Sequence, residues 1–295
     1  MTPYDDELAA AGLDPAAVLA QIREALAEDL PAGDVTSLAT IAAEAQGTGV
    51  FAAREAGVVA GLGVAALVFH EVMGDTVTVT DRVPDGTRVE PGDVVMRVSG
   101  PTRGLLTAER TALNYASHLS GVATATSHWV EALSGTRAQV LDTRKTLPTY
   151  RALQKYAVRC GGGVNHRFSL SDRAMVKDNH VVAAGGVVPA FQAVRAAYPD
   201  LRVEVEVTDL DQLRELLDVG CTEILLDNMD SATLAEAVRL NDARGPAGRA
   251  TLEASGGLTL ERAREVAETG VDFISVGALT HSVKVFDLGL DLSEG

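Results

Sequence analysis

The feature that most constrains the fold is a regular alternation of short apolar strands and amphipathic helices between residues 138 and 276. The hydrophobic periodicity predicts strands at Ala138–Asp142, Ala174–Val176, Val203–Val207, Glu223–Leu226, Thr251–Ala254 and Phe273–Val276. It predicts intervening helices at Pro148–Val158, Val188–Tyr198, Leu210–Val219, Ala232–Leu240 and Leu260–Glu268. Strands joined through helices form right-handed βαβ units, and such units build a parallel sheet.

Residues capable of chemistry end each of these strands or follow it directly. They are Asp142-Thr143-Arg144-Lys145, Lys177-Asp178-Asn179-His180, Glu206, Asp227-Asn228, Ser255-Gly256-Gly257 and Gly277. A ring of polar groups at the carboxyl ends of the strands is where α/β barrels build their active sites. Six predicted strands do not complete an eight-stranded barrel, so the pattern favours an incomplete or modified barrel over an open sheet.

The first third of the chain has a different pattern. An amphipathic helix is expected over Pro15–Leu30, and strand-like segments follow at Gly49–Ala53, Gly57–Ala60, Thr76–Asp81 and Val94–Ser99. Turns between these segments suggest a small, partly antiparallel sheet. A helical pattern then runs from Leu105 to about Leu133, with an expected interruption at Ser120-Gly121. We place the domain boundary near the start of that helix.

The charge of the chain is unevenly distributed. Its 295 residues include 25 Lys and Arg against 41 Asp and Glu, a formal charge of −16, which disfavours nucleic acid or an anionic membrane as a partner. Between Asp142 and His180, however, eight basic residues stand against three acidic ones. A cationic cluster within an acidic protein predicts a small polyanionic substrate.

Two groups of cations within that window have different interpretations. Three of them are spaced by four on one predicted helix, where a solvated helix surface is the favoured interpretation: Arg151, Lys155 and Arg159. Four others lie at strand ends or in a glycine-rich loop, where binding is favoured: Arg144, Lys145, Arg167 and Lys177. Arginine forks bind carboxylates or phosphates bidentately, so Arg144 and Arg167 suit a substrate with two such groups.

Composition excludes several other classes. The longest uncharged apolar stretch, Ala56–Phe69, is shorter than the ~18 residues of a membrane span. The acidic start lacks the features of an export signal, so we expect a cytoplasmic protein. Cys160 and Cys221 have neither metal-site nor disulfide spacing and are expected to be small core residues.

The segment GGVNHRFSLSDRAMVKDNH is the most specific in the chain. Its glycines, Gly161–Gly163, allow the backbone to approach a ligand, and His166 and Arg167 then offer hydrogen-bond donors. Later glycines follow the last two predicted strands, where barrels commonly bind phosphate.

Carboxylates end two successive apolar strands. Glu206 and Asp227 must be paired, hydrated or metal-bound to offset their desolvation. The alternation in VEVEV points Glu204 and Glu206 the same way, so one of them could instead be an interior salt-bridge partner. The functional interpretation is that Glu206 and Asp227 bind sugar hydroxyls and a hydrated Mg²⁺ that bridges to a polyphosphate.

Several motifs together resemble the quinolinate phosphoribosyltransferase family over most of the chain. In the family's order they are ERTALNYASHLSGVAT, LDTRKTLP, GGGVNHR, KDNH, VEVEV, ILLDN, EASGG and FISVGALTH. The resemblance implies an N-terminal α/β sandwich, residues 1–108, and an open α/β barrel of about seven strands, residues 109–281. It implies that residues 282–295 pack with the first domain and that the protein is at least a homodimer.

The implied reaction is phosphoribosyl transfer from phosphoribosyl pyrophosphate (PRPP) to quinolinate with decarboxylation. The products are nicotinate mononucleotide, pyrophosphate and CO₂, in NAD biosynthesis, and the implied cofactor is Mg²⁺. The family's catalytic positions match Lys145, Lys177, Glu206 and Asp227, the carboxylates being linked to the metal through water and PRPP.

Other positions match substrate contacts. The quinolinate side matches Thr143, Arg144, His166 and Arg167 with Lys177, and Arg110 matches an arginine supplied by the neighbouring subunit. The 5′-phosphate side matches Ser255, Gly256, Gly257, Ser275, Val276, Gly277 and His281. One departure is Phe168-Ser169, where the family usually has a large apolar residue and then glycine; it leaves the backbone angle of that loop open.

Two other functions are considered beside this one. A barrel aldolase or decarboxylase would use Lys177 as a Schiff-base amine. A non-catalytic phosphosugar-binding or carrier protein is suggested by VPDGTRVEPGDVVMRVSG, which resembles a carrier hairpin but has no lysine at its turn. A close paralogue acting on a different aromatic acid also stays open.

Overall fold

The computed structural model describes residues 2–294, and the chain divides into two compact units. Unit 1 runs to Ser127 and also contains Ala152–Gly162 and the segment from Ser282 onward. Unit 2 contains His128–Arg151 and Gly163–His281. The division falls within a long helix and not near residue 108, because most of that helix packs in unit 1.

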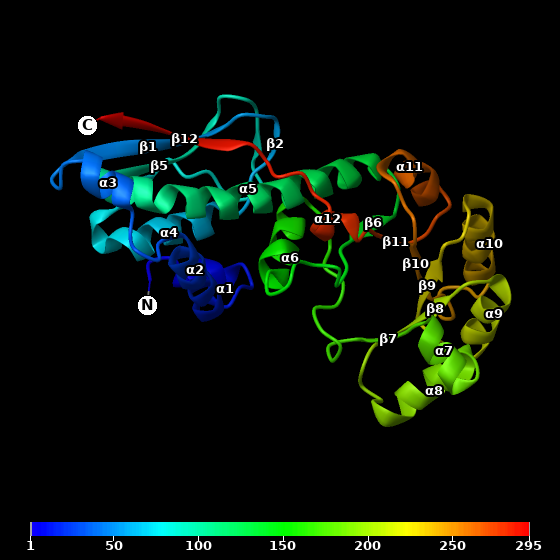
Figure 1. Cartoon of the computed structure of the whole chain (residues 1–295). Helices are drawn as coiled ribbons and strands as arrows, with labels where there is room; N and C mark the ends of the chain where they lie inside the picture. The colour runs from blue at the N-terminus through cyan, green and yellow to red at the C-terminus, as the bar shows by residue number, and fades with distance from the viewer. Residues whose placement is uncertain (1, 295) are drawn as a thin grey trace. The chain divides into compact units, whose positions relative to one another are not determined.

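Unit 1 is built on an antiparallel sheet that joins the two ends of the chain. The strand order is β12-β1-β5-β3, with β1 at Gln46–Ala53, β3 at Thr78–Thr80, β5 at Val94–Pro101 and β12 at Leu288–Glu294. β12 pairs with β1 in a continuous register from Gly47 opposite Glu294 to Ala53 opposite Leu288. The chain's last strand is therefore part of its N-terminal sheet (Figure 1). A two-stranded ribbon, β2 (Gly57–Val58) with β4 (Arg88–Val89), is separate from it.

Helices complete unit 1. They are α1 (Asp5–Ala10), α2 (Pro15–Asp29), α3 (Val35–Thr40), α4 (Leu62–Met73), α5 (Thr102–Ala132) and α6 (Arg151–Cys160), with a short 3₁₀ turn at Gly74–Thr76. α5 crosses from unit 1 into unit 2, and α6 begins on the last residue of a unit 2 segment.

The apolar stretch Ala56–Phe69 forms β2 and most of α4. Residues Leu62–Phe69 are apolar and all buried, so this part of α4 has no polar face. The Asp85 carboxylate accepts hydrogen bonds from the backbone N–H groups of Gly61 and Leu62, at 2.8 and 3.1 Å, and caps the helix. Among residues 2–294 no helix is both long and apolar enough to span a membrane.

α5 is continuous through Ser120 and Gly121, so the expected interruption there is wrong. The Ser120 hydroxyl bonds the backbone of Ala60, with its oxygen 3.0 Å from the Ala60 nitrogen. A Cβ on Gly121 would collide with the carbonyl oxygen of Lys284, which belongs to the segment leading into β12. The glycine marks a close crossing of two backbones and not the end of a helix.

Unit 2 is an α/β structure with a parallel sheet of six strands. In spatial order these are β6 (Gln139–Leu141), β11 (Phe273–Ser275), β10 (Thr251–Ser255), β9 (Glu223–Asp227), β8 (Val203–Val207) and β7 (Ala174–Val176). Val164 adds a parallel bridge to Leu141, which extends the sheet towards the position of a seventh strand. The pairing ends at β7 on the other side, so the sheet is open.

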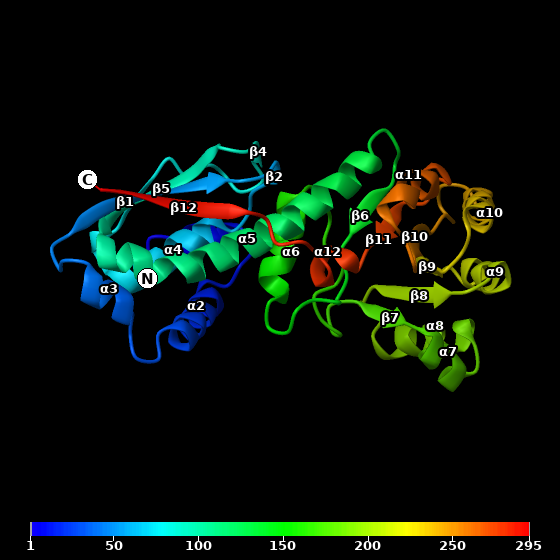
Figure 2. The same cartoon turned by 45° about the horizontal axis from the view of Figure 1, so that its top comes forward.

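Helices of unit 2 connect strands of its sheet: α7 (Asp178–Ala184), α8 (Val187–Ala197), α9 (Leu210–Asp218), α10 (Ser231–Asp242) and α11 (Leu260–Glu268). A short helix, α12 (Ala278–His281), follows the last strand, β11. Figure 2 shows the strands side by side with helices along their outer side. All six predicted strands are present, and α7 is an additional helix directly after Lys177. Because the strands are parallel, their carboxyl ends meet at one edge.

The backbone crossing at Gly121 predicts a stability effect. Gly121→Ala should lower the free energy of unfolding by about 1–3 kcal/mol, because the displaced backbone outweighs the roughly 1 kcal/mol gained in helix propensity. Urea unfolding followed by circular dichroism measures this. The matched control is Gly104→Ala in the same helix, where the new Cβ would meet the side chain of Met73, which can move. Stabilisation by Gly121→Ala equal to a simple propensity gain would contradict the crossing.

Candidate active site

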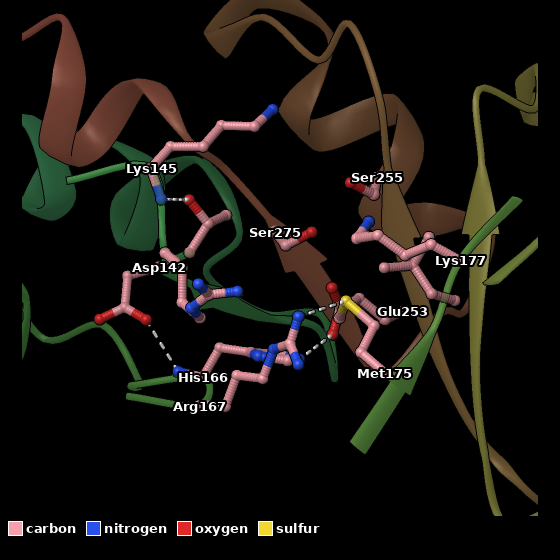
Figure 3. Close-up of a pocket in the computed structure, with 12 residues that line it drawn as sticks. Asp142, Lys145, His166, Arg167, Met175, Lys177, Glu253, Ser255 and Ser275 are labelled. Carbon is pink, nitrogen blue, oxygen red and sulfur yellow. Dashed lines mark hydrogen bonds and ion pairs between the residues drawn. The ribbon is translucent and has the colours of Figure 1, made fainter. Parts of the chain in front are cut away.

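Two cavities open at the carboxyl ends of the strands of unit 2. The first, of about 290 Å³, is lined by Asp142, Thr143, Arg144, Lys145, His166, Arg167, Met175, Lys177, Leu225, Glu253, Ser255 and Ser275 (Figure 3). The second, of about 570 Å³, is lined by Thr143, Lys145, Lys177, Asp178, Glu206, Asp227, Asn228, Ser255–Leu258, Ser275–Ala278 and His281. Five residues line both, so the cavities adjoin.

The first cavity gathers several cations, among them the guanidinium groups of Arg144 and Arg167. The Nε atom of Arg144 is buried and has no hydrogen-bond partner within residues 2–294. Arg167 donates to the carbonyl oxygen of Arg173 at 3.3 Å and lies 3.5 Å from the sulfur of Met175. Burial, and then the charge of Arg144, lowers the pKa of Arg167. An anionic ligand would offset this repulsion between guanidinium groups.

His166 lies in the first cavity against buried carboxylates. Its Nε2 atom is 2.8 Å from Glu204 Oε2 and 3.4 Å from Glu253 Oε2. Desolvation by itself would lower the pKa of His166, but the two carboxylates outweigh it and raise the pKa to about 9. The imidazole is therefore an imidazolium cation at neutral pH and adds a positive charge to the cavity wall.

The same carboxylates hold further cations below the cavity. Arg173 lies 3.1 Å from His166 Nε2 and 3.5 Å from Glu204, and it also forms an ion pair with Glu223. Burial and the nearby charge of Glu253 raise the pKa of Glu204. His166, Glu204 and Glu253 are close enough together to hold a metal ion. Because the guanidinium of Arg173 already faces them, we interpret the cluster as an ion-pair network.

A loop of the backbone carries His166 and Arg167 to this position. The buried Asp142 carboxylate accepts the His166 N–H at 2.8 Å and the Asn165 side-chain amide at 2.6 Å. Further along the loop, Asp172 accepts the N–H groups of Phe168 and Ser169, at 2.7 and 3.1 Å. The non-glycine residues with positive φ among residues 2–294 are Asp81, Thr149 and Asn228, so Ser169 has an ordinary backbone angle. This loop does not require a glycine there.

The second cavity has carboxylates on one side. Glu206 Oε2 accepts from Lys177 Nζ at 2.6 Å. Asp227 accepts from the side-chain amide of Asn228 at 2.7 Å. Both carboxylates lie at the ends of neighbouring strands, β8 and β9. Their hard oxygen atoms, beside an open cavity, fit a hydrated Mg²⁺ shared with a ligand, since two carboxylates alone do not complete its coordination.

Glycine-rich turns form the other side of the second cavity. Gly256 and Gly257 have φ values of +94° and +60°, in the left-handed region that favours glycine. A Cβ on Gly277 would lie 2.9 Å from the Lys145 side chain and 3.2 Å from His281 Nε2. Glycine-rich turns of this kind beside a cavity suit a phosphate, because backbone N–H groups can approach it closely.

Every predicted site residue except Arg110 lines one of these cavities. Arg110 is exposed on α5 in unit 1. The sequence interpretation missed Met175 and Glu253 as lining residues. Glu253 could have been found, since it lies two residues before Ser255 on the same strand and therefore on the same face. Met175 has no comparable signal in a short apolar strand.

The solvated surface expected for Arg151, Lys155 and Arg159 of α6 is present only at Arg159. Lys155 is fully buried, and Arg151 bonds the loops after β6 and after Arg167. Arg159 is exposed but donates to the carbonyl oxygen of Ala11. The two cysteines are a buried Cys221 and a half-buried Cys160, and burial raises the pKa of each thiol to about 11, so neither is a reactive thiolate.

Comparison with known proteins identifies relatives for both parts of the chain. Residues 34–120 match the model of the quinolinate phosphoribosyl transferase N-terminal domain, and residues 122–291 match that of the C-terminal domain. Nicotinate-nucleotide pyrophosphorylase [carboxylating] of Mycobacterium leprae is 54% identical over 273 residues, which cover 92% of this chain and 95% of the relative.

Solved structures are similar over nearly the whole chain. The crystal structure of NadC from Streptococcus pyogenes has a TM-score of 0.90 and 40% identity, covering 96% of this chain and 98% of the other. The structure of nicotinate-nucleotide pyrophosphorylase from Francisella tularensis has a TM-score of 0.88 and 37% identity, covering 94% and 96%.

The charge of His166 predicts a pH dependence. Its folded-state pKa of about 9 lies above the ordinary 6.5, so its stabilising contribution is complete below about pH 6.5 and is lost as pH rises through 9. The stability difference between the protein and His166→Gln should shrink by up to about 3 kcal/mol from about pH 6 to pH 10. Urea unfolding across this range measures it.

The same titration can be followed directly by NMR of the imidazole. Glu204→Gln should lower the pKa of His166, whereas Glu236→Gln on the surface of α10 should leave it unchanged. A stability difference that stays flat with pH, or a His166 pKa near 6.5, would contradict the ion-pair network.

Proposed function

The chain belongs to the quinolinate phosphoribosyltransferase family, and we propose that the two adjoining cavities of unit 2 are its two substrate subsites. The protein is a pentosyltransferase of NAD biosynthesis that transfers the phosphoribosyl group of PRPP to quinolinate with decarboxylation. The observation that supports the subsite assignment is the difference between the two linings: two arginines, two lysines and His166 line the first cavity, and Glu206, Asp227 and glycine-rich turns line the second.

We assign quinolinate to the first cavity. Its two adjacent carboxylates match the guanidinium groups of Arg144 and Arg167, with Lys177 and the His166 imidazolium completing the positive wall. Thr143 lines the same cavity, and its hydroxyl accepts the Lys145 N–H at 3.0 Å. Binding then neutralises cations that repel each other in the free enzyme.

We assign PRPP to the second cavity. Its 5′-phosphate would be bound by the turns at Ser255–Gly257 and Ser275–Gly277 with His281, and its ribose hydroxyls by Glu206 and Asp227. Lys145 lines both cavities, so its ammonium group is placed for the pyrophosphate between the two reactants. The Thr280 hydroxyl donates to the Lys145 carbonyl oxygen at 2.7 Å and fixes the backbone at that position.

The chemistry follows from this placement. The ring nitrogen of quinolinate attacks the anomeric carbon of PRPP while pyrophosphate departs next to Lys145, so the residues chiefly orient two anions and offset their repulsion. Bound Mg²⁺, held through water and PRPP near Glu206 and Asp227, would supply charge neutralisation for the leaving group. The ribosylated ring nitrogen is cationic, and it stabilises the carbanion left when the bond to the adjacent carboxylate breaks and CO₂ departs. That carbanion then takes a proton from water and becomes nicotinate mononucleotide.

A homodimer fits the position of Arg110. Its side chain is exposed in unit 1 and lines neither cavity of its own chain, so we propose that it serves the cavity of a second copy. The cytoplasm is the proposed location, supported by two cysteines that are free thiols.

The alternative aldolase mechanism is disfavoured by the site. A Schiff-base lysine attacks as an unprotonated amine, whereas Lys177 forms an ion pair with Glu206 at 2.6 Å. The carrier interpretation is disfavoured as well, because Val94–Pro101 is a central strand of the unit 1 sheet.

The subsite assignment predicts a selective effect on quinolinate. Arg144→Ala should raise the KM for quinolinate by about 10–100-fold and change that for PRPP by less than about 3-fold, because a bidentate carboxylate contact is lost. Steady-state release of CO₂ and nicotinate mononucleotide measures both constants. Arg239→Ala, an exposed arginine of α10, serves as the control. Equal increases for both substrates would sink the assignment.

The metal proposal predicts an effect on the Mg²⁺ requirement that leaves the KM for quinolinate almost unchanged. Chelation of divalent cations should abolish turnover, and added Mg²⁺ should restore it. Asp227→Asn should raise the Mg²⁺ concentration for half-maximal activity by about 10-fold, with the KM for quinolinate changed by less than about 2-fold. Asp218→Asn, which removes a carboxylate from a surface ion pair, is the matched control. Full activity after chelation would refute the proposal.

A further inference from the structure

The guanidinium of Arg151 joins two loops of unit 2. Its Nε atom donates to the Thr146 hydroxyl at 3.1 Å, and its two terminal nitrogens donate to the carbonyl oxygens of Phe168 at 2.8 Å and Arg144 at 3.4 Å. The first loop follows β6 and carries Arg144. The second carries Arg167, the residue directly before Phe168. One side chain therefore connects the segments that present the two arginines of the first cavity.

Arg144 and Arg167 need such a connection because they repel each other. The charge of Arg144 contributes to the low pKa of Arg167, so the two guanidinium groups interact unfavourably. Other contacts already connect the loops where they begin. Leu141 forms a backbone bridge with Val164, and the Asp142 carboxylate accepts the N–H of His166. Arg151 adds a second connection between the two loops, at Arg144 itself and at Phe168, the residue that follows Arg167.

We propose that Arg151 is a positioning residue for quinolinate, one that fixes the spacing of Arg144 and Arg167 so that they match two adjacent carboxylates. Arg151 itself lines neither cavity, so it acts through the loops and not by touching the substrate. This inference rests on the proposed role of Arg144 and Arg167 as carboxylate ligands.

The planar fork of arginine is what the three contacts require. Its nitrogens donate in several fixed directions at once, whereas a lysine ammonium is a compact charge at the end of a flexible stem. Arg151→Lys should therefore keep the charge but not the spacing. Thr146→Val removes one acceptor and leaves the two carbonyl contacts in place.

The experiment measures both KM values and the binding of a substrate analogue. Arg151→Ala should raise the KM for quinolinate by about 10-fold, with the KM for PRPP changed by less than about 2-fold. Arg151→Lys should reverse only part of this increase. Thr146→Val should raise the KM for quinolinate by less, and the double variant Arg151→Ala/Thr146→Val should have the same KM as Arg151→Ala alone. Benzene-1,2-dicarboxylate, which has the two carboxylates but no ring nitrogen, should show the same loss of affinity by calorimetry without PRPP.

Controls separate positioning from a general structural role. Arg214→Ala removes an exposed helix arginine whose hydrogen bond goes to Asp211 of its own helix, and it should leave both KM values unchanged. Thermal unfolding of each variant shows whether the fold is intact. Equal changes in both KM values, a fall in kcat alone, or full rescue by Arg151→Lys would overturn the proposal.

The test also separates this inference from the subsite assignment on which it rests. If Arg144→Ala and Arg167→Ala leave the KM for quinolinate unchanged, the assignment fails and the inference fails with it. If they raise that KM and Arg151→Ala does not, the assignment stands and the positioning role of Arg151 is wrong.

Discussion

The site depends on carboxylates buried beneath its cations. Glu204, Glu223 and Glu253 lie on three adjacent strands, β8, β9 and β10, and all three are buried. Burial of a carboxylate is costly unless cations and hydrogen bonds offset it. Here His166 pairs with Glu204 and lies 3.4 Å from Glu253, and Arg173 and Arg202 pair with Glu223. The loop from residue 164 to residue 173 is thereby anchored at both ends, by Asp142 near its start and by Glu204 and Glu223 near its end. Arg167, between these anchors, forms no ion pair with a carboxylate among residues 2–294, which is consistent with the ligand role proposed for it.

Much of this arrangement could be predicted from the sequence because topology does most of the placement. Once a parallel sheet is inferred, residues at the carboxyl ends of its strands must meet at one edge, whatever their separation along the chain. That argument brings together Lys177, Glu206 and Asp227, and the structure places all three around the second cavity. The resemblance of the motifs then supplied the substrate, which spacing and charge alone described only as a small polyanion.

Other features depend on tertiary neighbours that no local pattern reveals. Residues Leu62–Phe69 of α4 are enclosed and apolar on all sides, so hydrophobic periodicity did not indicate a helix there. Gly121 resembles a helix breaker, yet it stays helical because the Lys284 backbone crosses there. Arg151, Lys155 and Arg159 have the spacing of a solvated face, but one is buried and two bond distant backbone. In each case the environment of the residue is set by segments distant in the sequence, which a local pattern does not contain.

In the proposed assignment, the two adjoining cavities explain how one site can accept two anions. Lys145 and Lys177 line both cavities, so each lysine can lower the electrostatic cost of bringing either reactant close to the other. Lys177 already has a carboxylate partner in Glu206, which keeps the free enzyme from concentrating uncompensated charge at the junction. Among residues 2–294 no carboxylate forms an ion pair with Arg144 or Arg167, and in the proposed assignment the carboxylates of the ligand relieve the repulsion between them. The free energy released by that neutralisation is available for holding the acceptor in the orientation that the transfer requires.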